Sequence, residues 1–499
     1  MKSMKRLLLI AWTVALAAGC ATTQSATTQS ATPPGAAVQG AAPQAGASSQ
    51  GSANPRTMTF PPLKFQIPAS ERVQLRNGMV VYLLQDHELP IVNLTCYLNA
   101  GSIYDPPAKV GLAALTGATL RSGGTLETTP DKLDRELEFM ASSIESAIGA
   151  DSANVSLTTL TKNLDRTLAL FAELMTKPAF DPSRVELARL HAIEGIRRQN
   201  DDPKEIASRE LNSAIYPGHP LSLIPTIASV KAITRQDMID FQKRYFYPAN
   251  TILAVSGDFD REKLLASLET LFAQWTNRPP TFPTVADPVD DSSPAVLHIQ
   301  KEVNQSVIRM GHLGIDKNNP DLYAIKVMDF ILGGGFTSRL TQEIRSNQGL
   351  AYNVDSYFET GRRFRGPFIA ETETKSETTV KATTLLRSII AGMTLAEVTP
   401  KELDLAKDSI INSFIFGFAR SDAVVAQRAR LEFYGYPAGY LENYRDNIAR
   451  VTREDVLRVA RKYLHPDAMK LVVVGDQKKF DQPLTTFGKV REITLDNTK

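Results

Sequence analysis

Cysteine is nearly absent from this sequence, which limits both its covalent cross-linking and its thiol chemistry. The 499 residues include two cysteines, Cys20 and Cys96. Cys96 lies in the alternating run 92–97, which is typical of a thiol buried on a β-strand. A catalytic thiol is the alternative, but no motif surrounds Cys96. Since Cys20 is expected to be acylated, as argued below, an intramolecular disulfide is excluded in the mature protein.

An excess of charge of either sign is also lacking. Lys and Arg together number 56 and Asp and Glu 54, which leaves a formal charge of +2. Nucleic-acid-binding proteins usually carry a basic footprint, so we expect no nucleic acid among the partners. The six histidines include no two at close ligand spacing. We therefore expect no metal site in this chain.

Long hydrophobic runs are missing too, and the longest one lies at the N-terminus. A cationic start is followed by an apolar run, 7–18, that is too short to span a bilayer but typical of a secretory signal. The sequence Ala17-Ala18-Gly19-Cys20 resembles a bacterial lipobox. This resemblance implies a signal peptide over residues 1–19 and a lipid on Cys20. An ordinary secreted protein with an incidental cysteine is the alternative.

The segment after Cys20 has no charged residue from Ala21 to Pro55 and is composed almost wholly of Ala, Thr, Gln, Ser, Gly and Pro. Such a composition cannot bury enough apolar surface to offset its ordering entropy. We therefore expect residues 20–60 to be a tether. In a Gram-negative host, Ala21 after the cysteine resembles sorting to the outer membrane, which places the protein on the periplasmic side of the cell envelope.

The rest of the chain contains an internal duplication. Residues 234–258 and 452–476 share Thr, Arg, Asp, Tyr, Pro, Leu, Val, Gly and Asp at matching positions without a gap. Each copy predicts a Thr-capped helix, a proline stop and a strand that ends in Gly-Asp. Between the copies lies a proline-rich stretch typical of an extended linker. We predict an N-terminal domain over 61–276, a linker over 277–295 and a C-terminal domain over 296–490.

Hydrophobic periodicity predicts α+β domains. The runs 73–84, around an Asn77-Gly78 turn, and 91–98 alternate as antiparallel strands do, whereas 130–140 and 163–175 repeat apolar residues at helical spacing. In the second half, 307–310 and 352–358 are expected to be strands and 322–332 a helix. The elements lack the crossover pattern of a doubly wound sheet, so each domain is predicted to be a mainly antiparallel sheet flanked by helices.

The ordered motifs resemble peptidase family M16, the pitrilysin and mitochondrial-processing-peptidase-like group. The N-terminal motifs are the stretches 75–78, 99–102 and 111–113, and the C-terminal motifs are 332–340, 342–345 and 349–352. The resemblance covers residues 71–476 and implies two homologous metallopeptidase-like domains.

The metal motif of that family is missing from this chain. After Gly-Leu-Ala the family carries His-x-x-Glu-His, in which two imidazoles hold zinc and the carboxylate activates water. Here the three positions are Ala114, Gly117 and Ala118, and none can bind a metal. Glu194 falls where the resemblance places the third ligand. His191 and Glu194 lie three residues apart and would form half of another site, but a solvated helix pair is the simpler interpretation.

The second half keeps the other feature that the resemblance implies. In the family an arginine and a tyrosine seven residues later help to hold the peptide and to stabilise the oxyanion, and Arg345 and Tyr352 match them. A planar guanidinium and a phenol both suit a carbonyl that gains negative charge. A surface arginine beside a strand tyrosine is the alternative.

These features favour a zinc-free subunit of a two-chain M16 peptidase. The expected partner is an M16 subunit that carries His-x-x-Glu-His and its zinc, and the expected substrate is a peptide or unfolded polypeptide. A degenerate peptide-binding or scaffolding lipoprotein is the second hypothesis. An active peptidase with other metal ligands is the third.

Overall fold

The computed structural model describes residues 65–278 and 281–496. The signal peptide, the lipidated Cys20 and the tether predicted for residues 1–60 lie outside this part and stay predictions. None of the helices in the described ranges is long and apolar enough to cross a bilayer.

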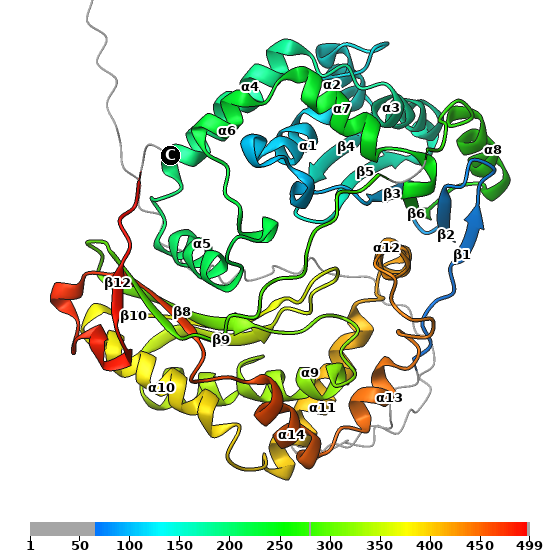
Figure 1. The fold of residues 1–499 in the computed structure, drawn as a ribbon. Coiled ribbons are helices and arrows are strands. Elements are labelled where there is room, and N and C mark those ends of the chain that lie inside the picture. Colours follow the sequence, from blue (N-terminus) through cyan, green and yellow to red (C-terminus); the bar gives the residue numbers. More distant parts are fainter. Residues whose placement is uncertain (1–64, 279–280, 497–499) are drawn as a thin grey trace, which may run out of the picture. The chain divides into compact units, whose positions relative to one another are not determined.

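The N-terminal half folds as one mixed sheet with helices (Figure 1). Within the described residues its strand order is β1-β2-β6-β3-β5-β4, and only β2 and β6 pair in parallel. The sheet is therefore mainly antiparallel. Its strands are β1 (Glu71–Gln74), β2 (Val80–Gln85), β3 (Ile91–Leu98), β4 (Ser143–Ile148), β5 (Ala153–Leu160) and β6 (Thr251–Gly257), and its helices are α1 (Leu112–Ser122), α2 (Pro130–Phe139), α3 (Leu164–Thr176), α4 (Pro182–Arg198), α5 (Pro203–Ile215), α6 (Ile227–Ala232), α7 (Arg235–Tyr245) and α8 (Arg261–Leu271).

The C-terminal half repeats this arrangement. Its strand order in the described residues is β12-β7-β11-β8-β10-β9, with parallel pairing of β7 to both β11 and β12. The strands are β7 (Ala295–Gln300), β8 (Gln305–Leu313), β9 (Ala351–Phe358), β10 (Pro367–Lys375), β11 (Lys470–Gly475) and β12 (Val490–Glu492), and the helices are α9 (Leu322–Leu332), a π-helix (Thr341–Asn347), α10 (Thr379–Gly392), α11 (Pro400–Phe416), α12 (Ser421–Phe433), α13 (Tyr444–Ala449) and α14 (Arg453–Tyr463).

The duplication and the α+β class are both confirmed. The order β2-β6-β3-β5-β4 in one sheet corresponds to β7-β11-β8-β10-β9 in the other. The repeated segments form α7 with β6 and α14 with β11. Thr234 and Thr452 each begin their helix with a capping box. The threonine hydroxyl accepts from the N–H of the third helical residue, an aspartate, and the aspartate carboxylate accepts from the threonine N–H. The same local chemistry therefore starts the same helix twice.

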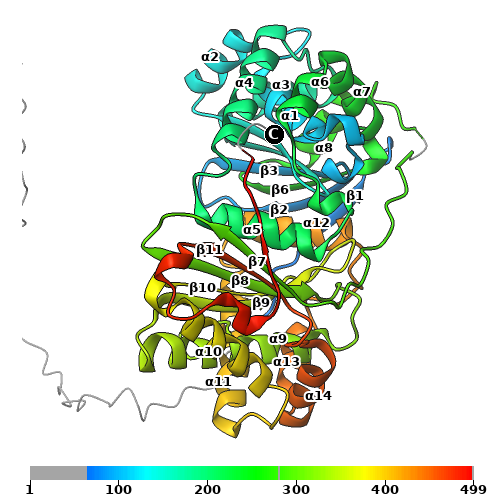
Figure 2. The same cartoon turned by 60° about the vertical axis from the view of Figure 1, so that its left-hand side comes forward.

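One helix of each half packs on the sheet of the other half. This exchange was not predicted from the sequence. Helix α5 packs on β8 and β11, and α12 packs on β2, β3 and β6. Figures 1 and 2 show α5 beside the C-terminal strands and α12 beside the N-terminal strands. Arg72 and the Tyr82 hydroxyl both donate to Glu432 on α12, at 2.7 and 2.6 Å. The two halves are therefore joined by exchanged helices as well as by the linker.

The exchange predicts that the two halves unfold together. Leu211 on α5 is 1% exposed and packs among apolar residues of β7, β8 and β11. Leu211→Ala should lower the free energy of unfolding by about 3 kcal/mol, because it leaves a cavity in that interface. Urea unfolding followed by fluorescence and circular dichroism should show one shared transition. Leu395→Ala, at a position 74% exposed, is the control and should change little.

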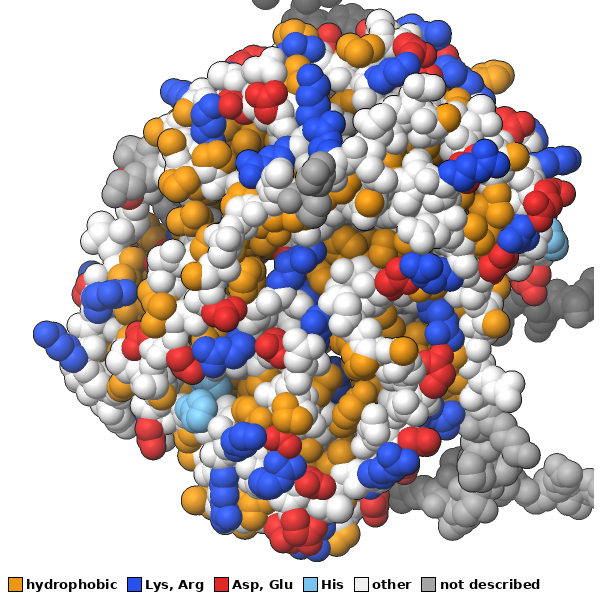
Figure 3. All heavy atoms as spheres, turned by 45° about the vertical axis from the view of Figure 1, so that its right-hand side comes forward, with side chains coloured by type: hydrophobic (Ala, Val, Ile, Leu, Met, Phe, Trp, Pro, Cys, Tyr) orange, Lys and Arg blue, Asp and Glu red, His pale blue; other side chains and the backbone are white. Residues whose placement is uncertain are grey.

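The surface carries charges of both signs. On the face drawn in Figure 3, Lys and Arg side chains lie interspersed with Asp and Glu side chains, with apolar side chains between them. Such an arrangement does not concentrate a field of one sign on this face, so it offers little electrostatic steering to a polyanion there.

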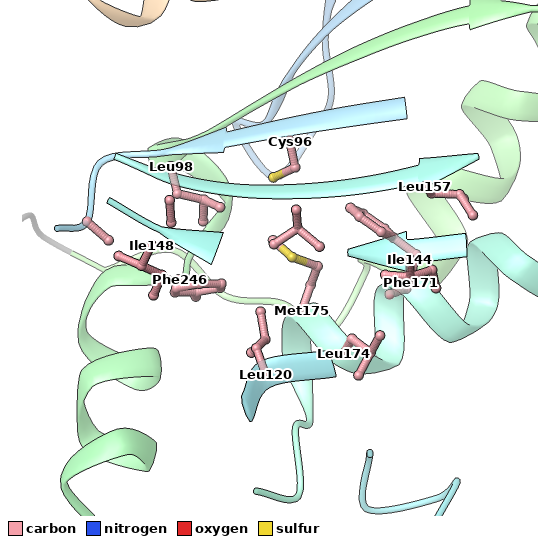
Figure 4. Packing of buried hydrophobic residues seen from close by; sticks show 14 of the residues in the cluster. Cys96, Leu98, Leu120, Ile144, Ile148, Leu157, Phe171, Leu174, Met175 and Phe246 are labelled. Atoms are coloured by element: carbon pink, nitrogen blue, oxygen red, sulfur yellow. The ribbon is translucent and has the colours of Figure 1, made fainter. Parts of the chain in front are cut away.

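Cys96 lies on β3 in the N-terminal core, with Met175 and Leu98 nearby (Figure 4). Its thiol is fully buried, and burial raises its pKa well above the usual range. The interpretation of Cys96 as a buried strand thiol is confirmed, because a nucleophilic thiol needs a low pKa and access to solvent.

Residues near both ends of the described chain take part in the fold. Strand β12 continues past residue 490, and the Ile493 N–H donates to the His298 carbonyl at 2.8 Å. Phe65, near the start of the described chain, lies 5.6 Å from Phe418 of the C-terminal half, ring to ring. Between α8 and β7, the described residues contain no helix or strand.

Candidate functional site

Helix α1 carries the three positions of the degenerate metal motif, and Asp105 fixes its first turn. Gly111 precedes the helix with φ of +106°, a left-handed conformation that favours glycine. The Asp105 carboxylate accepts from the N–H groups of Gly111 and Ala113, at 2.8 and 2.9 Å. A buried carboxylate therefore satisfies N–H groups that the start of a helix leaves without partners.

Asp105 should make stability depend on pH. Burial raises the pKa of this carboxyl to about 6, against an ordinary value of 3.8, although the N–H groups oppose the shift. The folded state then holds the proton more tightly than the unfolded state does. The resulting contribution to the free energy of unfolding is therefore complete below about pH 4 and is lost as pH rises through 6. Asp105→Asn should cost about 2 kcal/mol and remove this dependence. Urea unfolding of both proteins between pH 4 and 7 tests this, and parallel pH curves would contradict it.

The three motif positions lie in two different environments. Ala114 and Ala118 are exposed on one face of α1, one turn apart, whereas Gly117 is buried. A Cβ atom on Gly117 would lie 2.5 Å from the backbone nitrogen of Ile148 on β4. Helix and strand are therefore packed so closely that position 117 admits no side chain without a backbone shift.

These residues do not fit zinc. Alanine and glycine side chains supply no metal ligand, and the described residues contain no cluster of three or more His, Cys, Asp or Glu that could hold a metal. Glu194 is exposed on α4, where its carboxylate pairs with Arg198 at 2.9 Å and Arg197 at 3.7 Å. His191, one turn before it, is also exposed, and no ion pair joins it to Glu194 in the described chain. Both therefore fit the solvated helix face.

A cavity of about 520 Å³ lies where the motif faces α4. Ala114 and Ala118 line it from α1, and Leu187 and His191 line it from α4, whereas Glu194 is not among its lining residues. Most of the lining is aliphatic. This cavity was not predicted from the sequence, although two alanines in place of two imidazoles imply lost volume.

Arg345 and Tyr352 lie next to each other. The Arg345 guanidinium is 4.8 Å from the centre of the Tyr352 ring and 5.4 Å from that of Phe336. The two rings are 84% and 77% exposed, so they flank the guanidinium in an aromatic clamp that reaches solvent. Such contacts hold a cation in place while leaving its donors available. Phe336 was missed as a site residue because a single aromatic after a glycine run carries no distinctive pattern.

A second cavity, of about 330 Å³, adjoins this clamp. It is lined by Phe336 and Arg345 together with Asp355 and the glycine run 333–335. Burial, with Glu371 nearby, raises the pKa of Asp355 to about 6. Arg345 lies on the π-helix, a rare form often found at functional sites. Arg345 and Tyr352 do not line the α1 cavity, so the structure forms two separate sites.

Comparison with known proteins identifies the family. The model described as insulinase (peptidase family M16) matches residues 80–226, and that described as peptidase M16 inactive domain matches residues 232–410. This chain belongs to the peptidase M16 family. The match of two successive M16 models agrees with the two homologous halves described above.

Relatives of this M16 chain include proteins with different descriptions. It is 23% identical to the non-peptidase homolog YmxG of Helicobacter pylori over 79% of this chain and 91% of that protein. It is also 23% identical to an uncharacterized zinc protease of Rickettsia bellii, over 57% of this chain and 68% of that one. A crystal structure described as the peptidase M16 inactive domain from Pseudomonas fluorescens is 28% identical, with a TM-score of 0.74, and covers 82% of this chain and 98% of its own.

The M16 fold and the residues on α1 lead to one conclusion about chemistry. Position 117 has no room for a carboxylate, positions 114 and 118 carry methyl groups, and the relatives of this chain include a non-peptidase homolog. The chain is a non-catalytic M16 homologue.

Proposed function

We propose that this chain is the zinc-free subunit of a two-chain M16 peptidase. A partner M16 subunit supplies His-x-x-Glu-His with its zinc, and this chain contributes Arg345 and Tyr352 as contacts to a peptide or unfolded polypeptide. The observation that carries the proposal is the contrast between two places. The three motif positions on α1 carry no metal ligand, whereas the Arg345 guanidinium lies between two exposed rings.

The guanidinium of Arg345 suits a peptide carbonyl that gains negative charge. It presents planar N–H donors with a permanent charge, and the adjacent rings of Tyr352 and Phe336 restrict its position. Donors that are already oriented stabilise a developing oxyanion without reorganisation during the reaction. The Tyr352 phenol lies beside them as a further donor. The clamp therefore has the chemistry to assist hydrolysis that zinc on another chain performs.

Mixing experiments test this division of labour. The purified chain alone should hydrolyse no fluorogenic peptide in a zinc-dependent manner. Addition of an M16 subunit that carries His-x-x-Glu-His should give hydrolysis that a chelator abolishes. Chelator-sensitive hydrolysis by the purified chain on its own would refute the proposal. So would a rate for the combined chains equal to that of the zinc-bearing subunit alone.

A further inference from the structure

The cavity between α1 and α4 replaces a metal site with an aliphatic surface. Ala114 and Ala118, which occupy the positions of the two zinc-binding histidines, form part of one wall. Leu187 on α4 forms part of the opposite wall and is 44% exposed, so its side chain is accessible to a ligand in the cavity. At about 520 Å³ the cavity lies within the size range of small-molecule sites.

The ionisable groups that line the cavity are basic. They are the Arg184 guanidinium and the His191 imidazole, and no carboxylate is among the described residues that line it. Arg184 uses one nitrogen, Nη2, to donate to Asp131 at 2.8 Å, and the same nitrogen lies 3.5 Å from Asp134. The guanidinium has further N–H donors. An apolar ligand whose one anionic group accepts from these further donors therefore suits this lining.

We propose that the cavity between α1 and α4, where the M16 motif would hold zinc, binds an aliphatic carboxylate. Its chain lies against Ala114, Ala118 and Leu187, and its carboxylate lies toward Arg184 and His191. This inference goes beyond the proposed function, because it requires neither a partner chain nor peptide hydrolysis. It also accounts for the loss of the motif: methyl groups at positions 114 and 118 create the apolar wall that imidazoles would interrupt.

A series of ligands of increasing chain length tests the proposal on the purified mature protein. Isothermal titration with hexanoate, octanoate and decanoate should show an affinity that rises about fourfold for each added CH₂. Decylamine should bind at least about tenfold more weakly than decanoate, since its charge has the wrong sign for Arg184. Affinity that is independent of chain length, or equal for decylamine and decanoate, would overturn the proposal.

Matched variants locate the site. Ala118→Leu should fill the cavity and weaken decanoate binding at least about tenfold, and the exposed position should tolerate the larger side chain. Leu187→Ala should weaken binding about fivefold by removing wall contacts. Leu190→Ala is the control, because Leu190 is 54% exposed on α4 and does not line the cavity. Equal effects of Leu187→Ala and Leu190→Ala, or full binding by Ala118→Leu, would exclude this cavity as the site.

Discussion

Gly117→Glu should lower the free energy of unfolding by at least about 4 kcal/mol, although glutamate is the residue that the M16 motif places there. The first side-chain carbon would lie 2.5 Å from the Ile148 backbone nitrogen, so α1 and β4 would have to separate. A carboxylate at this buried position would also lose its hydration without a partner cation, which adds to the cost. Chemical unfolding, or loss of soluble expression, measures the effect.

A gentler change at the same position separates crowding from charge. Alanine normally stabilises a helix by about 1 kcal/mol relative to glycine. Gly117→Ala should instead destabilise the protein by about 2 kcal/mol, because its methyl group meets the backbone of β4. Gly195→Ala is the matched control within α4, where an added Cβ has no neighbour within 4 Å, and it should stabilise the protein. If both alanine variants were stabilising, the close packing of Gly117 would be disproved.

The expected effects of Gly117→Glu and Gly117→Ala mean that the three motif positions cannot be exchanged independently of the packing of α1. Histidines at the exposed positions 114 and 118 should be tolerated, whereas glutamate at position 117 should not. Restoring all three residues should therefore fail to restore zinc-dependent hydrolysis, because α1 now packs against β4 at a distance that has no room for the general base. Reversal would require movement of the helix as well as new side chains.

The features that could be predicted from the sequence depend on interactions between residues that are close along the chain. Thr234 and Thr452 start equivalent helices because a hydroxyl and an aspartate three residues later satisfy the same N–H groups. The run 322–332 is helical throughout because its apolar residues repeat at the helical period. Repetition of such signals was enough to establish the duplication and the α+β class.

The features that it missed depend on contacts between distant segments. The apolar face of α5 does not say which sheet it covers, and it packs on the C-terminal one through Leu211. Nothing near Gly117 in the sequence shows that β4 approaches it. Arg345 and Tyr352 were singled out by their family spacing, but the third member of the clamp, Phe336, comes from a separate turn. Tertiary proximity, not propensity, decides each of these.

Arg345→Ala should lower kcat/KM of the two-chain peptidase by about 100-fold to 1000-fold, the usual effect of removing one donor from an oxyanion site. Arg345→Lys should recover only part of the activity, because an ammonium keeps the charge but lacks the planar fork. Phe336→Leu should cost less than about tenfold, since it removes one ring beside the guanidinium and leaves the donors in place. Arg420→Ala is the control, at an exposed arginine that pairs with Asp422.

These rates are informative only when assembly is measured as well. Arg345 lies at the surface beside exposed rings, so its replacement should leave the fold intact and the complex formed, as sedimentation of the mixed chains would show. A complex that forms normally but hydrolyses peptide slowly places Arg345 in the reaction. A complex that forms and turns over at the full rate without Arg345 would instead support a scaffolding chain, in which the M16 fold holds a peptide or a partner and contributes nothing to hydrolysis.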